Sequence, residues 1–165
     1  MNYRPNIVGA EYLVRKILPA VRKQYGEIRV LLSGANPHSR VKRLAGNGVE
    51  VSGWVDDIRD SYLQSKVFIA PMQIGTGLQN KLLEAMAMRI PCITSPLANE
   101  ALGAVDGEDI LIAESPEKYA NHIAELLSNE TTYETVAENG FRFVTDNYNW
   151  YKNTRKLAAL MASSA

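Results

Sequence analysis

Residues 67–88 read VFIAPMQIGTGLQNKLLEAMAM, and the order of features in this stretch indicates the fold class. An apolar, β-branched run at Val67–Ala70 passes through a loop with two glycines into helical spacing over Leu78–Met88. A second apolar run follows at Cys92–Thr94. Because a helix between two short buried strands is a crossover connection, the stretch predicts a pair of parallel strands.

The same alternation of apolar runs and helical spacing extends in both directions along the chain. Helical spacing recurs over Asn6–Tyr25 and Lys118–Leu127. The segment Glu117–Ser163 predicts two or three successive helices, with breaks near Asn129-Glu130 and near Asn147–Trp150. Further strand-like runs occur at Ile28–Leu32, Val49–Val51 and Ile110–Ile112. We therefore predict an α/β fold, a Rossmann-like doubly wound parallel sheet with helices on both faces and a C-terminal helical segment.

The beginning of the chain departs from this pattern. Doubly wound sheets usually open with a strand, whereas Met1–Asn6 leads almost directly into helical spacing. We expect either a very short opening strand or a chain that is the downstream part of a larger protein. In the second case, a central strand would be missing and the sheet would have unpaired edges.

Composition excludes several classes of protein. The 165 residues contain 18 Lys and Arg against 18 Asp and Glu, a balance that argues against a general nucleic-acid binder. The single cysteine, Cys92, can form neither an internal disulfide nor a cysteine-rich zinc site. No signal peptide or apolar run of about 20 residues is present. We expect one cytoplasmic domain over residues 1–165. Asp56-Asp57 is predicted to cap a helix over residues 58–64 rather than to bind a metal, and no metal site is expected.

The loop before the predicted helix has features of an anion site. Gly75 and Gly77 allow positive φ and a close approach of the backbone to a ligand. Lys81 adds a positive charge in the first helical turn. The helix dipole and the first amides would suit a diphosphate, these amides being those of Gly77, Leu78, Gln79 and Asn80. A tight turn that requires glycine explains the motif equally well.

Glu84 is the more specific signal, because the predicted helix around it is almost entirely apolar. A carboxylate in such a helix is seldom buried without a partner. The two hydroxyls of a ribose are one suitable partner, since an ionised carboxylate accepts two hydrogen bonds. The alternative is an intrahelical ion pair with Lys81, three residues earlier, which spacing alone favours.

The segment Leu83–Ser95, LEAMAMRIPCITS, resembles the LEAMAxGxPVIxT signature of the group 1 glycosyltransferases, glycosyltransferase family 4. The likeness extends over essentially the whole chain and indicates the C-terminal, nucleotide-sugar-binding half of the two-domain GT-B architecture. Similar family segments stand at Tyr3–Asn6 (YxPN), Ser33–Pro37 (VGxGP), Val51–Asp57 (VxxGxVxD) and Gly75–Lys81 (GxGxxxK).

The resemblance implies a role for each matching residue. Glu84 matches the second glutamate of the E-x7-E motif, which holds the donor ribose, and Val55 beside Trp54 matches the position that meets the base. Gly77, Leu78 and Gln79 match the backbone that lies on the diphosphate. The implied donor site therefore comprises Gly34, Trp54, Val55, Gly75, Thr76, Gly77, Leu78, Gln79, Asn80, Lys81 and Glu84.

Two departures from the family pattern concern charge. Thr76 stands where the first glutamate of E-x7-E would be, and Asn6 lies near the position of the family's lysine. The arginine of the family's Arg…Lys pair would precede Met1. Since a diphosphate needs cationic compensation, we expect Lys81 to supply it, with Arg4 as a secondary helper.

The resemblance implies retaining, metal-independent transfer from a nucleoside-diphosphate sugar, in bacterial surface polysaccharide or glycolipid synthesis, with no cofactor. The partners expected are the donor and an N-terminal acceptor-binding domain absent from this chain, with no nucleic acid. The full-length enzyme would associate peripherally with the inner face of the membrane. We identify no catalytic residue and expect the chain alone to be inactive. The alternatives are a non-catalytic nucleotide-binding module and a GT-B nucleotide-sugar 2-epimerase.

Overall fold

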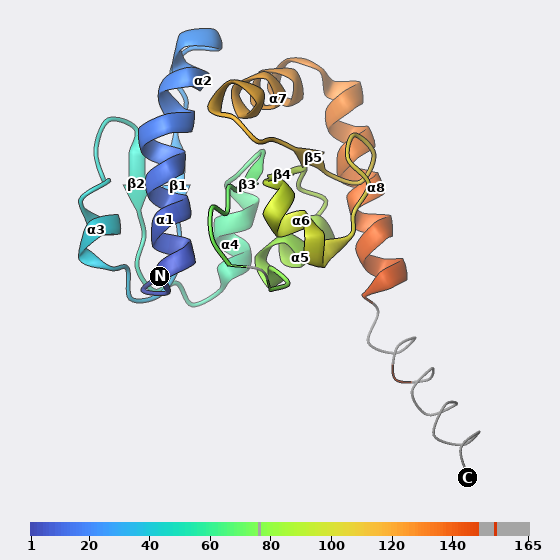
Figure 1. Ribbon diagram of the computed structural model, residues 1–165, viewed down its shortest axis with the longest axis horizontal. Coiled ribbons are helices and arrows are strands. Elements are labelled where there is room, and N and C mark those ends of the chain that lie inside the picture. The colour runs from blue at the N-terminus through green and yellow to red at the C-terminus, as the bar shows by residue number, and fades with distance from the viewer. Residues whose placement is uncertain (76, 149–153, 155–165) are drawn as a thin grey trace.

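The computed structural model describes residues 1–75, 77–148 and 154 (Figure 1). The predicted apolar runs form five short strands, and every ladder between them is parallel. The strands are β1 (Val30–Leu32), β2 (Val49–Val51), β3 (Phe68–Ala70), β4 (Cys92–Thr94) and β5 (Leu111–Ile112). The prediction of an α/β fold with a parallel sheet is confirmed.

Helices cover both faces of the strands. The N-terminal helix consists of α1 (Arg4–Tyr12), the π-helical turn η1 (Leu13–Ile17) and α2 (Leu18–Gln24). The remaining helices are α3 (Ser39–Lys42), α4 (Ile58–Leu63), α5 (Asn80–Ala87), α6 (Pro96–Leu102), α7 (Pro116–Ser128) and α8 (Glu130–Asn147). In Figure 1, α2 and α7 lie together at one end, and α8 runs down the opposite side from α1.

The core is divided by the sheet because successive strand residues point to opposite faces. Ile93 of β4 belongs to a cluster with Ile17, Val21 and Tyr119. Its neighbour Cys92 lies in a second cluster with residues of α5 and α8. Cys92 is 1% exposed, which confirms its prediction as a small buried apolar residue.

Several helices begin at residues whose side chains cap them. Asp57 accepts a hydrogen bond from the Arg59 amide at 2.9 Å, so the predicted cap of α4 is confirmed. Asn129 accepts one from the Thr132 amide at 3.1 Å and separates α7 from α8, where the sequence predicted a break. Residues 149–153 and 155–165, where a further helix was expected, lie outside the described part.

The sheet has two parts. β1 pairs with β2, and β3, β4 and β5 form a separate three-stranded sheet. No ladder joins β1 to β3 within the described residues, so the sheet is interrupted between these two strands. The carboxyl ends of the strands nevertheless point to one common edge, where the candidate site lies.

No helix of the described residues combines the length and the apolar character that crossing a bilayer requires. Within the same part of the chain, no three His, Cys, Asp or Glu residues are grouped so that they could hold a metal ion.

Candidate functional site

The loop between β3 and α5 forms one part of the carboxyl edge. Gly75 has φ of 96°, and a Cβ at this position would lie 3.3 Å from Cγ of Pro5, so two constraints favour glycine here. Gly77 has no positive φ, and a Cβ there would meet nothing within 4 Å. The prediction of positive φ is confirmed for Gly75 and is wrong for Gly77, whose side-chain position is open space.

Helix α5 begins three residues after Gly77, whose amide was predicted to be the first of the helix. Asn80 is its first residue and Gln79 its N-cap, so Gly77 and Leu78 belong to the loop rather than to the helix. The Gln79 side chain caps no amide of α5; instead, its Nε2 donates to the Gly77 carbonyl at 2.7 Å. The first amides of α5 therefore carry no side-chain cap and can meet an anion.

Glu84 lies on α5 with its carboxylate exposed. Its Oε2 accepts a hydrogen bond of 2.8 Å from the hydroxyl of Tyr62, a residue of α4 that is 7% exposed. Burial and the hydrogen bond to Glu84 both raise the pKa of Tyr62, so the hydroxyl remains a donor. No second partner of this carboxylate is found among the described residues, which leaves Oε1 for a ligand.

Lys81 does not form the ion pair with Glu84 that spacing alone favoured. Its Nζ donates to Oδ1 of Asn6 at 2.7 Å and lies 3.3 Å from Sδ of Met72. Within the described residues it has no carboxylate partner. Burial lowers the pKa of Lys81 to about 8, because the ammonium is partly removed from water without a compensating charge.

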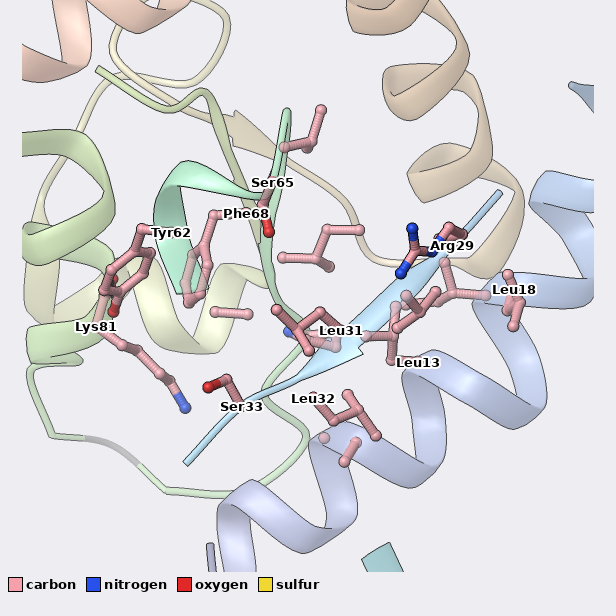
Figure 2. Close-up of a pocket in the computed structure, with 18 of the residues that line it drawn as sticks. Leu13, Leu18, Arg29, Leu31, Leu32, Ser33, Tyr62, Ser65, Phe68 and Lys81 are labelled. Atoms are coloured by element: carbon pink, nitrogen blue, oxygen red, sulfur yellow. Dashed lines mark hydrogen bonds between the residues drawn. The ribbon is translucent and has the colours of Figure 1, made fainter. Parts of the chain in front are cut away.

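A cavity of about 820 Å³ opens beside these two residues. Figure 2 shows Tyr62 and Lys81 on one side and the segment of Leu31 and Ser33 on the other, with the Lys81 side chain directed towards Ser33. Gly34 follows at the end of β1, with φ of 145°. Lys81, Glu84 and Gly34 are the predicted site residues that line this cavity.

The other candidates lie elsewhere along the edge. Trp54, which is 76% exposed, and the partly buried Val55 follow β2. Neither Trp54 nor Val55 lines the cavity, and the same holds for the described loop residues Gly75, Gly77, Leu78, Gln79 and Asn80. Thr76 lies outside the described residues. Arg4, the secondary helper, is exposed and does not line the cavity either.

Residue-by-residue reasoning missed three hydroxyl groups at this edge. Ser33 Oγ lies 2.6 Å from Ser61 Oγ, and Ser52 donates to Ser33 at 2.9 Å. The bonds join the ends of β1 and β2 to α4, which also carries Tyr62. No motif marked Tyr62 or Ser61. Ser33 and Ser52 lie within segments that resemble the family, but no role was assigned to either.

The chain is similar in sequence to several known proteins. The sequence model of the family described as "Glycosyl transferases group 1" matches residues 1–129. An uncharacterized 44.6 kDa protein in the cps region of Klebsiella pneumoniae is 26% identical over 152 residues, which are 87% of this chain and 39% of that protein. The uncharacterized glycosyltransferase MJ1069 of Methanocaldococcus jannaschii is 30% identical over 125 residues, 71% of this chain and 32% of that protein. The chain thus spans well under half the length of either relative.

Two solved structures show the same fold. The C-terminal domain of the group 1 family protein LpcC from Francisella tularensis has a TM-score of 0.66 at 20% identity, covering 88% of this chain and 79% of that chain. Anabaena Alr3699/HepE, solved in complex with UDP-glucose, has a TM-score of 0.74 at 14% identity, covering 89% of this chain and 44% of that chain.

Proposed function

The chain belongs to the group 1 glycosyltransferases and has the fold of the C-terminal domain of their GT-B architecture, and we propose that it binds the nucleoside-diphosphate sugar donor for retaining, metal-independent transfer. The UDP-glucose complex of the Anabaena protein supports this class of donor. The relative encoded in a cps region supports a role in bacterial surface polysaccharide synthesis.

One observation carries the proposal: the exposed residue Glu84 lines the cavity, and its carboxylate accepts a hydrogen bond from the buried Tyr62. A carboxylate held in this way accepts two hydrogen bonds from the vicinal hydroxyls of a ribose. Lys81, about one turn earlier on α5, places a positive charge near the first free amides of the helix. Together these groups match the ribose and the diphosphate of one nucleotide.

The same groups favour departure of the leaving group. When the bond between the anomeric carbon and the diphosphate breaks, negative charge accumulates on the diphosphate oxygens. A protonated Lys81 and the amides of α5 stabilise that charge in place, without reorganising at the moment of reaction. The proposed N-terminal domain would bind the acceptor, whose hydroxyl oxygen forms the new bond to the anomeric carbon, and would supply the group that takes up the hydroxyl proton. The isolated chain would then bind the donor without transferring its sugar.

Isothermal titration calorimetry with UDP-glucose, GDP-mannose and ADP-glucose tests the proposal directly. We expect one of the three to bind, and we expect Glu84→Gln to weaken that binding by about tenfold or more, since a hydrogen bond to a charged group is worth about 1.5–3 kcal/mol. Glu134→Gln on α8, an exposed glutamate outside the cavity, is the matched control. Equal affinities of the two variants would remove Glu84 from the site.

A non-catalytic nucleotide-binding module remains the second candidate, and Asn6 and Thr76 favour it because both replace charged residues of the family pattern. The two candidates differ in one measurement on the longer polypeptide. Release of free nucleoside diphosphate in the presence of lipid-linked acceptors supports the transferase. Donor binding without any such release supports the module.

A further inference from the structure

A second pocket, of about 280 Å³, lies at the amino end of β2, at the opposite edge of the strands from the candidate donor residues. Val49, the first residue of β2, lines it together with the loop before that strand, whereas Trp54 and Val55 come after β2 ends. Figure 1 shows α3 and β2 beside the N-terminal helix, away from α5 and α8. Among the described residues, Leu18 alone lines both cavities.

Within the described residues, three arginines and no carboxylate line this pocket, which we call the arginine pocket. Arg15 comes from η1, Arg22 comes from α2, and Arg43 directly follows α3. Because three separate elements supply these side chains, the cluster exists only in the folded chain. The lining therefore carries three positive charges, on groups whose paired N–H donors match the geometry of phosphate oxygens.

Neighbouring carboxylates do not neutralise these charges. Glu11 lies 3.9 Å from Nη2 of Arg15, but both of its oxygens accept hydrogen bonds from Arg40. The pKa of Glu11 is lowered first by the hydrogen bond with Arg40, and the charge of Arg43 has the smallest effect on it. Arg43 forms no ion pair of its own within the described residues. Its charge is therefore available to a ligand.

Arg22 is the most buried of the three, since Arg15 and Arg43 are exposed. Its Nη2 donates to the Asn47 carbonyl. Its buried Nε forms no hydrogen bond within the described residues, although the exposed carboxylate of Glu27 lies 3.1 Å away. A partly buried guanidinium with an unsatisfied donor has lost hydration, which a bound anion can replace.

The loop that lines one side of the pocket also has free donors. Gly46, Asn47 and Gly48 all have positive φ, of 114°, 48° and 77°. A Cβ on Gly48 would lie 3.0 Å from Nη2 of Arg22, so glycine lets the loop lie against the guanidinium. The amides of Asn47 and Gly48 donate no hydrogen bond within the described residues. Successive free amides in a turn are a common feature of anion sites.

The distribution of charge along the chain supports the same assignment. Residues 1–50 contain nine Lys and Arg against three Asp and Glu, whereas residues 51–165 contain nine against fifteen. The zero net charge of the chain therefore hides a basic N-terminal third, and the arginine pocket is formed entirely within it. A basic surface of this kind raises the local concentration of anions.

We propose that the arginine pocket binds a terminal phosphate group, at a site separate from that of the sugar donor. Arg15 and Arg43 hold the phosphate oxygens from the solvent side, Arg22 supplies charge from the interior side, and the amides of Asn47 and Gly48 complete the site. The phosphate belongs either to a small soluble molecule or to the headgroup of a lipid. The inference does not depend on the donor assignment, because the two cavities are lined by different charged residues.

Titration with inorganic phosphate, against chloride at equal ionic strength, tests the pocket through the amide signals of the ¹H–¹⁵N spectrum. We expect saturable shifts at Asn47 and Gly48. Arg43→Gln should weaken this affinity by about tenfold, because a charge-assisted contact is lost. Lys42→Gln is the matched control, since it removes the same charge from an exposed neighbour outside the pocket, and it should change the affinity by less than about twofold.

A further variant separates this site from the donor site. Glu84→Gln should leave the phosphate affinity measured at Asn47 and Gly48 unchanged, whatever it does to nucleotide binding. Two outcomes would overturn the proposal. In the first, phosphate causes no saturable shift at the two loop amides. In the second, Arg43→Gln and Lys42→Gln weaken phosphate binding equally, which would show diffuse attraction to a basic surface.

Sedimentation with vesicles distinguishes the two sources of the phosphate. Vesicles of phosphatidylcholine with phosphatidic acid present a terminal phosphate, whereas those with phosphatidylglycerol present a phosphodiester. Sedimentation that requires phosphatidic acid, and that Arg43→Gln abolishes while Lys42→Gln does not, identifies a lipid headgroup as the ligand. Saturable binding of inorganic phosphate without sedimentation on either kind of vesicle identifies a soluble phosphate as the ligand.

Discussion

The ammonium of Lys81 and the side-chain oxygen of Asn6 lie 2.7 Å apart, although 75 positions separate them in the sequence. The neutral amide fixes the position of the cation without neutralising it, so the charge stays available to an anion at the cavity mouth. Lys81 thereby brings from α5 a charge that the family pattern places near the start of α1.

Replacement of Lys81 should stabilise the protein below pH 8. The folded-state pKa of about 8 lies below the ordinary value of 10.5, so between these values the unfolded chain binds more protons and stability rises with pH. Lys81→Met removes a cost that is fully present below pH 8, up to about 3 kcal/mol, and its advantage should vanish near pH 10.5. Urea denaturation at pH 7 and 10.5 measures this, with the exposed Lys42→Met as control. An equal gain in the free energy of unfolding at pH 7 and at pH 10.5 would contradict the lowered pKa of Lys81.

Nucleotide binding should also depend on this proton. A bound diphosphate favours the charged lysine, so UDP affinity should be flat below pH 8 and fall by up to about tenfold per unit above it. Titrations at pH 8 in buffers of different ionisation enthalpy should report proton uptake in the wild type. We expect no such uptake in Lys81→Met.

The substitution Asn6→Asp tests whether an uncompensated charge is what the site needs. The new carboxylate would pair with Lys81, raise its pKa and repel the diphosphate, so UDP affinity should fall by about tenfold or more. Asn6→Ala removes the hydrogen bond without adding charge, and a loss of no more than about threefold is expected. Similar losses of affinity for both variants would show that Asn6 acts by positioning Lys81, and that the absence of charge at residue 6 is unimportant.

Tyr62→Phe should weaken UDP binding through Glu84. The phenyl ring keeps its packing against Phe68, while the hydrogen bond to Glu84 is lost. One hydrogen bond of this kind corresponds to a loss of about three- to tenfold in affinity. Tyr148→Phe is the control, because that hydroxyl donates to the Leu102 carbonyl at 2.8 Å, away from the cavity. If calorimetry finds that neither Tyr62→Phe nor Tyr148→Phe changes the affinity, Tyr62 does not contribute to nucleotide binding.

The two loop glycines should respond differently to alanine. Gly75→Ala forces an alanine to a φ of 96° and brings its methyl against Pro5, so the free energy of unfolding should fall by about 1–3 kcal/mol. The methyl group added by Gly77→Ala would lie in open space, so the free energy of unfolding should change by less than about 0.5 kcal/mol. If the diphosphate lies over Gly77, the same methyl should reduce UDP affinity severalfold; unchanged affinity would place the diphosphate elsewhere.

The sequence alone predicted the five parallel strands, the helices that precede β1 and follow β3, and the helical C-terminal segment. These features follow from local patterns, because apolar runs and helical spacing record which residues each element must bury. The caps at Asp57 and Asn129 were also predictable, since a cap depends on its own side chain and the next few amides.

The tertiary structure alone decided which groups meet. Spacing favoured a pair between Lys81 and Glu84, but packing of α1 and α4 against α5 gives each a different partner, Asn6 and Tyr62. The open space at Gly77 and the cavity lined by Lys81 and Glu84 likewise depend on segments distant in the chain. No local pattern records such contacts, because they arise only when the elements pack together.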